Sequence, residues 1–375
     1  MTMITDRRAL LAGGFGLAAA AALSRPAHAH SSTAFDTVLD TTFTDLAPVA
    51  LGGAIVTAEG LAWQGVRGVR RSGNPDPVEA ADKWHLGSNA KAMTAAVYGR
   101  LVDRGDARWD TPVSKIFADV PVDAAWDGVT LRDLMHHRAG LVDATVLGRD
   151  WMMTARRDPA SLVDQRTALA AKAFSAAPGG ELQRFAYANA NYVMIGAAIE
   201  RLTGRSWEDA MRTELFEPLG LSSAGLGAPR TNAQGGPNAW GHRGAAAPLT
   251  PMDPASPAAD NPLAMSPAGG VHMTLADYAA FLRAIIRGGG GWLTPETIGV
   301  LITPPDGGEP YAGGWGVRRN EAGDRVLGHS GSNTLWHVTA SLNLTSGVAV
   351  IGATNQPSQN GAPKNLTQAL SRARE

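Results

Sequence analysis

The spacing of hydrophobic and polar positions changes along the chain, and these changes outline a fold. Two short apolar stretches, 49–57 and 61–70, follow a helical pattern over 34–46 and are joined by a short turn, which predicts one helix and then two strands. From 88 onwards the apolar positions return at helical spacing, and the main predicted helices are 88–102, 130–136, 160–174, 189–202, 207–215 and 275–286. After residue 291 the pattern predicts strands over 314–319, 325–328, 336–344 and 348–355 and a last helix over 366–374.

Strands at both ends and helices between them favour an α+β fold. The simplest arrangement is one antiparallel sheet built from both termini and flanked by the terminal helices, with a mainly helical domain inserted. We expect a sheet subdomain from about 30–80 and 290–375 and a helical subdomain from about 81–289, with a site in the cleft between them. The Gly/Pro/Ala-rich passage 229–262 predicts a surface excursion near the mouth of that site.

The first residues have the three parts of an export signal. Arg7 and Arg8 precede an apolar run over 9–23, and residues 27–29 offer an Ala-x-Ala cleavage site. The paired arginines resemble a twin-arginine signal, and the apolar run is short and rich in Gly and Ala for a transmembrane helix. We therefore expect residues 1–29 to be an export signal and the mature chain to be periplasmic or secreted, without a stable membrane span.

Composition narrows the possible functions. The chain has 33 Lys and Arg against 34 Asp and Glu and no basic stripe, which argues against a nucleic-acid partner. It has no cysteine, so disulfides, thiol nucleophiles and thiolate metal sites are excluded. His136 and His137 are adjacent and point to different sides of a helix, so we interpret them as packed structural residues. The tryptophans are interpreted as core and cleft wall, namely Trp84, Trp292, Trp315 and Trp336.

The candidate chemistry begins in the predicted helix over 88–102, whose largely apolar composition predicts burial. Ser88 and Lys91 are three residues apart and project from the same helix face. Burial lowers the pKa of a lysine amine, so Lys91 could accept a proton from Ser88 and activate it as a nucleophile. The backbone N–H of Ser88 is also free at the helix start and suits an oxyanion. The alternative is a helix-capping serine beside a lysine that reaches solvent.

A second cluster lies just before the predicted helix over 189–202. Tyr187 and Asn189 are two residues apart, so both side chains could enter the cleft. A cationic lysine nearby favours the phenolate of Tyr187, which could then serve as a general base. Asn189 could accept from the lysine and donate to a substrate carbonyl. The alternative is a half-buried aromatic residue followed by an N-cap asparagine.

A third cluster contains His329, Gly331 and Ser332. The glycine allows close approach of a substrate backbone, and His329 could donate to a substrate carboxylate or to the tyrosine oxygen. The N–H of Ser332 could be a second oxyanion donor, opposite that of Ser88. One alternative is a polar hairpin turn. Another makes Ser330 the nucleophile of an α/β-hydrolase elbow, but that motif requires a glycine in place of Ser332 and a following helix.

Taken in order, Ser88-x-x-Lys91, Tyr187-x-Asn189 and His329-x-Gly331 resemble the motifs of the penicillin-recognising serine hydrolases. The resemblance is to the branch of class C β-lactamases and serine D-peptidases, to which family VIII esterases are related. Three further segments resemble landmarks of that family: 134–141, 215–221 and 266–270. The resemblance covers about residues 35–355.

The resemblance implies a β-lactamase/transpeptidase-like fold and an acyl-serine mechanism that needs no metal or organic cofactor. Ser88 would attack a small ester, amide or peptide substrate, with Lys91 and Tyr187 sharing the role of base. Asn189 would orient the acyl side chain, and the N–H groups of Ser88 and Ser332 would hold the oxyanion. The resemblance does not distinguish an esterase from a D-peptidase or an amidase, and no pattern indicates an oligomeric state.

One departure bears on the substrate. His329 stands where class C β-lactamases carry a lysine, and a neutral imidazole offers less positive charge to a β-lactam carboxylate. We therefore predict weak or absent β-lactam turnover. A genuine class C-like β-lactamase and a non-catalytic penicillin-binding-like protein are the alternative functions.

Overall fold

The computed structural model describes residues 28–374 except residues 246 and 358–360. Nearly all of the predicted export signal, residues 1–27, lies outside the described part, so this signal stays a prediction. In the part of the chain that is described, no helix is both long enough and apolar enough to cross a membrane.

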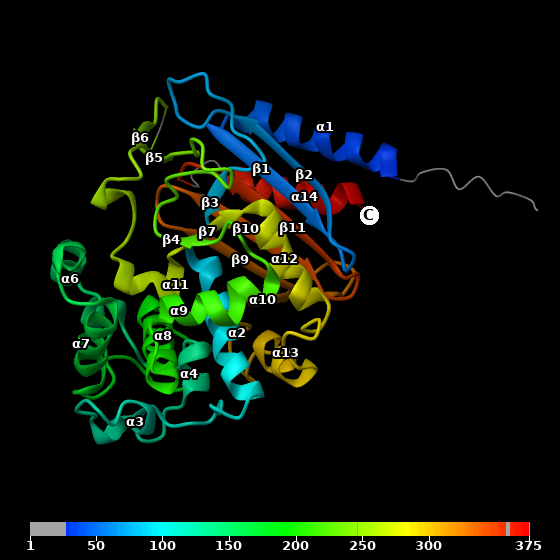
Figure 1. The fold of residues 1–375 in the computed structure, drawn as a ribbon. Coiled ribbons are helices and arrows are strands. Elements are labelled where there is room, and N and C mark those ends of the chain that lie inside the picture. Colours follow the sequence, from blue (N-terminus) through cyan, green and yellow to red (C-terminus); the bar gives the residue numbers. More distant parts are fainter. Residues whose placement is uncertain (1–27, 246, 358–360, 375) are drawn as a thin grey trace, which may run out of the picture.

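A six-stranded antiparallel sheet combines the two ends of the chain (Figure 1). Its order is β2 (Leu61–Gly68), β1 (Ala50–Val56), β11 (Val348–Thr354), β10 (His337–Asn343), β9 (Arg325–Ser332) and β8 (Gly316–Arg319). The N-terminal β1 pairs with the C-terminal β11, so that Leu51 lies opposite Thr354. The predicted sheet from both termini is therefore confirmed.

Helices cover both faces of this sheet. The terminal helices α1 (His28–Leu46) and α14 (Ala362–Arg374) lie side by side on one face, and α12 (Leu275–Ile286) packs on the other. Two neighbouring glycines of β1 allow these close contacts. A Cβ added at Gly52 would lie 3.0 Å from Leu275 of α12, and one at Gly53 would lie 3.0 Å from Leu366 of α14.

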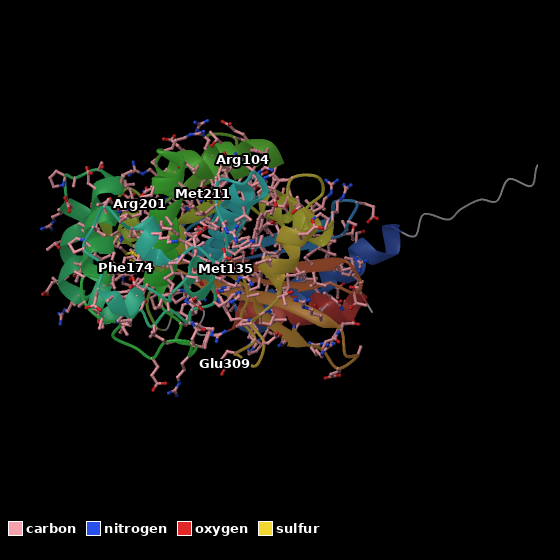
Figure 2. The ribbon with its side chains drawn as sticks, turned by 90° about the horizontal axis from the view of Figure 1, so that it is seen from below. Arg104, Met135, Phe174, Arg201, Met211 and Glu309 are labelled. Carbon is pink, nitrogen blue, oxygen red and sulfur yellow. The ribbon has the colours of Figure 1, made fainter. Side chains whose placement is uncertain are left out.

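The remaining helices form a layer beside the sheet, around the buried α2 (Ala90–Asp103). Figure 2 shows three apolar side chains of this helical layer, Met135, Phe174 and Met211, each at most 1% exposed. The longer helices are α7 (Leu162–Phe174), α8 (Asn189–Thr203) and α13 (Pro295–Ile302). The shorter helices are α3 (Val113–Ile116), α4 (Leu131–Met135), α5 (Asp143–Val146), α6 (Arg149–Thr154), α9 (Trp207–Met211), α10 (Glu217–Leu219) and α11 (Ser266–Gly269).

Two small sheets complete the fold. One has the order β3 (Lys83–His85), β7 (Val271–Thr274) and β4 (Gly225–Leu226), and the other pairs β5 (Gly241–Arg243) with β6 (Thr250–Met252). Strand β3 matters for the site because it leads directly into the 3₁₀ turn Gly87–Asn89 and then into α2.

Most predicted elements are confirmed, but the expectation that only strands and a last helix follow residue 291 is wrong. The helix α13 intervenes, and it begins with two helix-start signals. The Thr294 hydroxyl accepts from the N–H of Thr297, and Pro295 occupies the first turn. Ile298 and Leu301 are buried where α13 packs against α2.

Candidate active site

Ser88 and Lys91 lie where β3 turns into α2. Gly87 precedes the serine with a φ of +51°, and a Cβ at this glycine would lie 2.2 Å from the backbone nitrogen of Ser332. Only glycine fits this left-handed turn and close approach. The turn directs Ser88 toward Lys91, whose Nζ lies 3.0 Å from the serine Oγ.

The amine of Lys91 is fully buried and has three acceptors. Besides Ser88, its Nζ donates to Asn189 Oδ1 at 2.8 Å and to the carbonyl of Ala268 at 2.7 Å. Burial lowers the pKa of Lys91 from 10.5 to about 7, although the negative charge of Asp143 acts in the opposite direction. A large fraction of this lysine is therefore neutral near pH 7 and able to accept a proton. The alternative of a lysine that reaches solvent is wrong.

Asn189 is held in place by a residue that the sequence reading missed. Asp143, the first residue of α5, accepts from the Asn189 side-chain amide at 3.0 Å and from the backbone N–H groups of Asn189 and Ala190 at 3.0 and 2.8 Å. This carboxylate therefore satisfies the start of α8 and turns the Asn189 oxygen toward Lys91. The N-cap residue of α8 is Ala188, so the alternative of Asn189 as N-cap is wrong.

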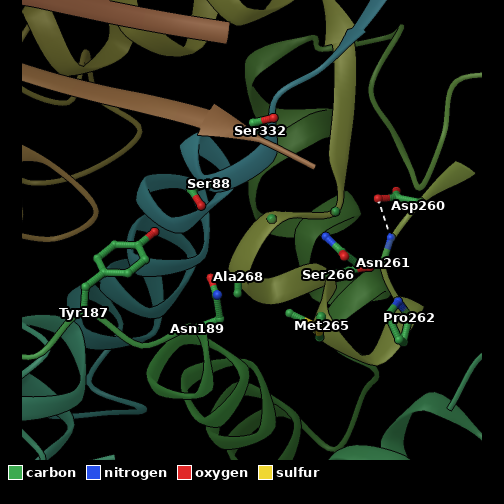
Figure 3. A pocket seen from close by; sticks show the side chains of 12 residues that line it. Ser88, Tyr187, Asn189, Asp260, Asn261, Pro262, Met265, Ser266, Ala268 and Ser332 are labelled. Atoms are coloured by element: carbon green, nitrogen blue, oxygen red, sulfur yellow. Dashed lines mark hydrogen bonds between the residues drawn. The ribbon is translucent and has the colours of Figure 1, made fainter. Parts of the chain in front are cut away.

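Tyr187 reaches the same point from the chain just before α8. The residue as a whole is 44% exposed, and Figure 3 shows its hydroxyl pointing toward Ser88. Burial raises the pKa of Tyr187 to about 12, and a hydrogen bond with Ser88 only partly opposes this. The prediction of a favoured phenolate is therefore wrong. The Lys91 amine lies over the Tyr187 ring, 4.9 Å from its centroid.

His137 packs against the ring of Tyr187. The two rings are 4.4 Å apart between centroids, and His137 Nδ1 accepts from the N–H of Ala188 at 3.3 Å. His136 and His137 are both buried, as predicted for packed residues. Among the described residues no group of three His, Asp or Glu side chains could hold a metal ion.

The third cluster lies on strand β9, which continues through Ser332. The hairpin-turn alternative is therefore wrong. His329 Nδ1 donates to the Ser330 carbonyl at 3.2 Å, so its Nε2 accepts from the Tyr311 hydroxyl at 3.1 Å. Burial and the charge of Lys91 lower the pKa of His329 to about 3. Since its single N–H is already used, His329 does not donate to Tyr187 as the sequence suggested.

The end of β9 lies directly against the turn that carries the serine. A Cβ at Gly331 would be 2.1 Å from the Leu86 carbonyl and 2.7 Å from the backbone nitrogen of Ser88. This contact brings the backbones of Ser88 and Ser332 to the same small space. Ser330 belongs to a strand with no following helix, and its exposed hydroxyl bonds His337 Nε2 at 2.5 Å. The context of a nucleophile elbow is therefore absent from this described segment.

Part of this site opens into one cavity of about 120 Å³ (Figure 3). Ser88, Tyr187, Asn189 and Ser332 line it. His329 and Gly331 are not part of the lining. The wall opposite Tyr187 is formed by the end of the passage 229–262, as predicted, and by α11 with the residue on either side of it. Its residues are Asp260, Asn261, Pro262, Met265, Ser266, Ala268, Gly269 and Gly270.

The interpretation of the tryptophans as core is confirmed. Trp84, Trp292, Trp315 and Trp336 are buried, with at most 7% exposure, but none of them lines the cavity, so they do not form its wall. A proton acceptor, a hydroxyl nucleophile and a neutral phenol thus meet at one cavity. This set of groups can support the transfer of an acyl group to a serine.

Comparisons with known proteins agree on a single family. A sequence model of the Beta-lactamase family matches residues 39–374. The chain is 27% identical over 291 residues to an unguisins hydrolase from Aspergillus campestris, covering 72% of this chain and 52% of that protein. It is 32% identical over 157 residues to penicillin-binding protein 4 of Amycolatopsis lactamdurans, covering 41% of this chain and 39% of that protein. The chain therefore matches about half or less of the length of these curated relatives.

Solved structures show the same fold. The D-amino acid amidase from Ochrobactrum anthropi SV3 superposes with a TM-score of 0.72, covering 92% of this chain and 99% of that chain at 19% identity. At this identity the similarity concerns the fold alone.

Proposed function

The chain belongs to the beta-lactamase family, and from this premise we propose that it hydrolyses small amides or esters through an acyl intermediate on Ser88. The predicted β-lactamase/transpeptidase-like fold is confirmed. The observation that carries the proposal is the buried Lys91 amine, whose pKa is lowered to about 7 and whose Nζ lies 3.0 Å from the Ser88 oxygen. Burying this amine is costly, and its position makes it a base for the serine.

In the first half of the reaction, the Ser88 oxygen attacks the substrate carbonyl carbon while its proton passes to neutral Lys91. The carbonyl oxygen becomes an oxyanion that accepts from the N–H groups of Ser88 and Ser332. Asn189, held by Asp143, orients the lysine and the acyl group. The bond to the leaving group then breaks as that group takes a proton.

Tyr187 is suited to deliver this proton because its pKa is raised to about 12, which keeps it a neutral phenol. The proton that Lys91 accepted then restores the phenol. In the second half, water attacks the acyl-serine, transfers its proton to the same pair of groups and releases the acid. Ser88 regains its hydrogen.

The cavity favours small acyl groups, and the structural similarity to a D-amino acid amidase supports amides as substrates. Turnover of β-lactams is expected to be slow because no lysine stands in the place of His329. A pKa lowered to about 3 keeps this imidazole neutral.

A panel of substrates tests the proposal. We expect turnover of 4-nitrophenyl butyrate or of alanine 4-nitroanilide, and a loss of about a thousandfold or more in Ser88→Ala. A chromogenic cephalosporin should be cleaved far more slowly. Cephalosporin turnover at the rate of the ester would instead indicate a β-lactamase. Saturable binding without turnover of any substrate would indicate a binding protein.

We also propose that the protein is exported, which rests on Arg7, Arg8 and the apolar run over 9–23. N-terminal sequencing of the protein from the periplasm or medium of an expressing bacterium should find a chain that begins near residue 30. A cytoplasmic protein with an intact N-terminus would contradict export.

A further inference from the structure

The cavity beside Ser88 has an unusual charge. Among its described lining residues, Asp260 is the only one that carries a formal charge at neutral pH. No arginine or lysine side chain belongs to the lining, and the buried Lys91 amine already has three oxygen partners, namely Ser88 Oγ, Asn189 Oδ1 and the Ala268 carbonyl. A substrate carboxylate would therefore meet a carboxylate here, and a substrate ammonium would meet an opposite charge.

The hydrogen bonds of Asp260 come from neutral groups. Its Oδ1 accepts from the backbone N–H of Asn261 at 2.8 Å and from Asn333 Nδ2 at 3.0 Å. Its Oδ2 lies 2.8 Å from His85 Nε2. A carboxylate has about four acceptor positions, so one position of Oδ2 is left for another donor.

The net charge of Asp260 and His85 together depends on how many protons the His85 ring carries. The backbone N–H of Gly87 donates to His85 Nδ1 at 3.2 Å, so Nδ1 must carry a lone pair. The single proton of the ring is therefore on Nε2 and points at Asp260. The pair then has a net charge of −1. Burial acts against this charge, yet the pairing with His85 above all, followed by the hydrogen bonds from Asn333 and Asn261, lowers the pKa of Asp260, so the carboxylate is ionised.

The position of Asp260 is fixed from three sides. His85 lies on β3, just before the turn that carries Ser88, and Asn333 follows Ser332 at the end of β9. The guanidinium of Arg156 binds the backbone carbonyl of Asp260 at 2.7 and 3.0 Å. This arginine is exposed and bonds the backbone rather than the carboxylate. The side chain of Asp260 is itself only 11% exposed.

The ion-pair partner of Asp260 is His85, which carries a charge only when it is protonated. With His85 in the neutral tautomer inferred above, the buried carboxylate is costly, and a ligand can supply the missing cation. Resting on the function proposed above, we propose that Asp260 selects substrates whose acyl group carries an ammonium, such as unprotected amino-acid amides. The ammonium would donate to the open position on Oδ2 while Ser88 attacks the carbonyl of the same acyl group, because both residues line this cavity. Asp260 is then a specificity-determining residue of the cavity.

Two boronic acids of nearly equal shape test this inference without any turnover. Boronic acids bond reversibly to a serine nucleophile, and 1-aminoethylboronic acid differs from isopropylboronic acid mainly by an ammonium in place of a methyl group. Calorimetry at pH 7 should show that the wild type binds the ammonium compound at least tenfold more tightly. In Asp260→Asn this ratio should fall to about one, and in Asp260→Glu most of the preference should return.

Controls separate charge recognition from loss of structure. Damage to the fold weakens both boronates alike and leaves their ratio unchanged, whereas loss of the carboxylate changes the ratio. Asp158→Asn removes a negative charge from the neighbouring cavity and not from the lining around Ser88, so it should keep the wild-type ratio. If Asp260→Asn does not fold, Asn261→Asp adds a carboxylate to the same lining and should raise the ratio.

Two results would overturn the inference: a wild-type ratio near one, or a wild-type preference that survives in Asp260→Asn. The failure of the proposed function is a separate result. It would appear as absent turnover of all esters and amides, whereas the boronate ratio reports only on the charge of the cavity.

Discussion

Replacing Lys91 by methionine should change how the stability of the protein depends on pH. The pKa of Lys91 is lowered by burial from 10.5 to about 7. Between these two values the unfolded chain binds a proton that the folded chain does not, so the contribution of this lysine to the free energy of unfolding rises with pH. Below pH 7 both states are protonated and the full penalty of burial remains.

The size of the effect follows from the two pKa values. Relative to a lysine with an ordinary pKa, Lys91 lowers the free energy of unfolding by about 4 kcal/mol at pH 7 and by about 2 kcal/mol at pH 9. The wild type should therefore gain about 2 kcal/mol relative to Lys91→Met between these pH values. The absolute stability of the variant is a separate matter. Methionine also leaves Asn189 Oδ1 and the Ala268 carbonyl without their donor, at about 1–3 kcal/mol each.

Urea unfolding of both proteins at pH 7, 8 and 9 measures this difference, in which all other titrating groups cancel. Lys172→Met controls for the removal of a lysine charge as such, because Lys172 is exposed and donates only to the Val146 carbonyl. Parallel stability curves for the wild type and Lys91→Met would refute the reasoning, since the pKa of Lys91 would then be the same in the folded and unfolded states.

Three further predictions concern activity. Neutral Lys91 is the base, so kcat/KM for an aryl ester should rise about tenfold per pH unit below about pH 7 and level off above it. A flat profile from pH 5 to 9 would contradict this role. Asp143→Asn removes a charge that raises the pKa of Lys91, so the rise in kcat/KM should move to lower pH. Turnover should also fall ten- to a hundredfold, because Asn189 loses the carboxylate that holds it. An unmoved pH profile would show that Asp143 does not act on the pKa of Lys91. Gly331→Ala would place a Cβ 2.1 Å from the Leu86 carbonyl and should lower kcat about a hundredfold by displacing the oxyanion donors. Gly128→Ala is the control: nothing lies within 4 Å of the added Cβ, so this variant should keep the wild-type kcat.

The part of the site that local geometry determines could be read from the sequence. Ser88 and Lys91 share one turn of a helix, so their contact follows from their spacing, and the apolar residues around them already predicted burial. Tyr187 and Asn189 reach Lys91 across about a hundred positions of the chain. Their place at the site was predicted from the resemblance to a family, because secondary-structure propensity alone does not determine which distant segments of the chain come into contact.

The errors have physical causes as well. Tyr187 was expected to ionise because a lysine is near, but burial of its hydroxyl is the largest influence on its pKa and raises it. The strand β9 was expected to end at Gly328, yet it continues because Gly331 permits a backbone contact with the serine turn. Asp143 and Asp260 were missed because a carboxylate in a loop shows no partner until the loop is placed.

The central claim, an acyl intermediate on Ser88, is tested most directly by mass spectrometry of the protein quenched with acid during turnover of an aryl ester. Trypsin cleaves after Lys83 and Lys91, so Ser88 lies on the peptide 84–91, whereas Ser330 lies on the peptide 326–364. We predict an added acyl mass on peptide 84–91 that is absent from Ser88→Ala. Labelling of peptide 326–364, or undiminished labelling of Ser88→Ala, would contradict the account.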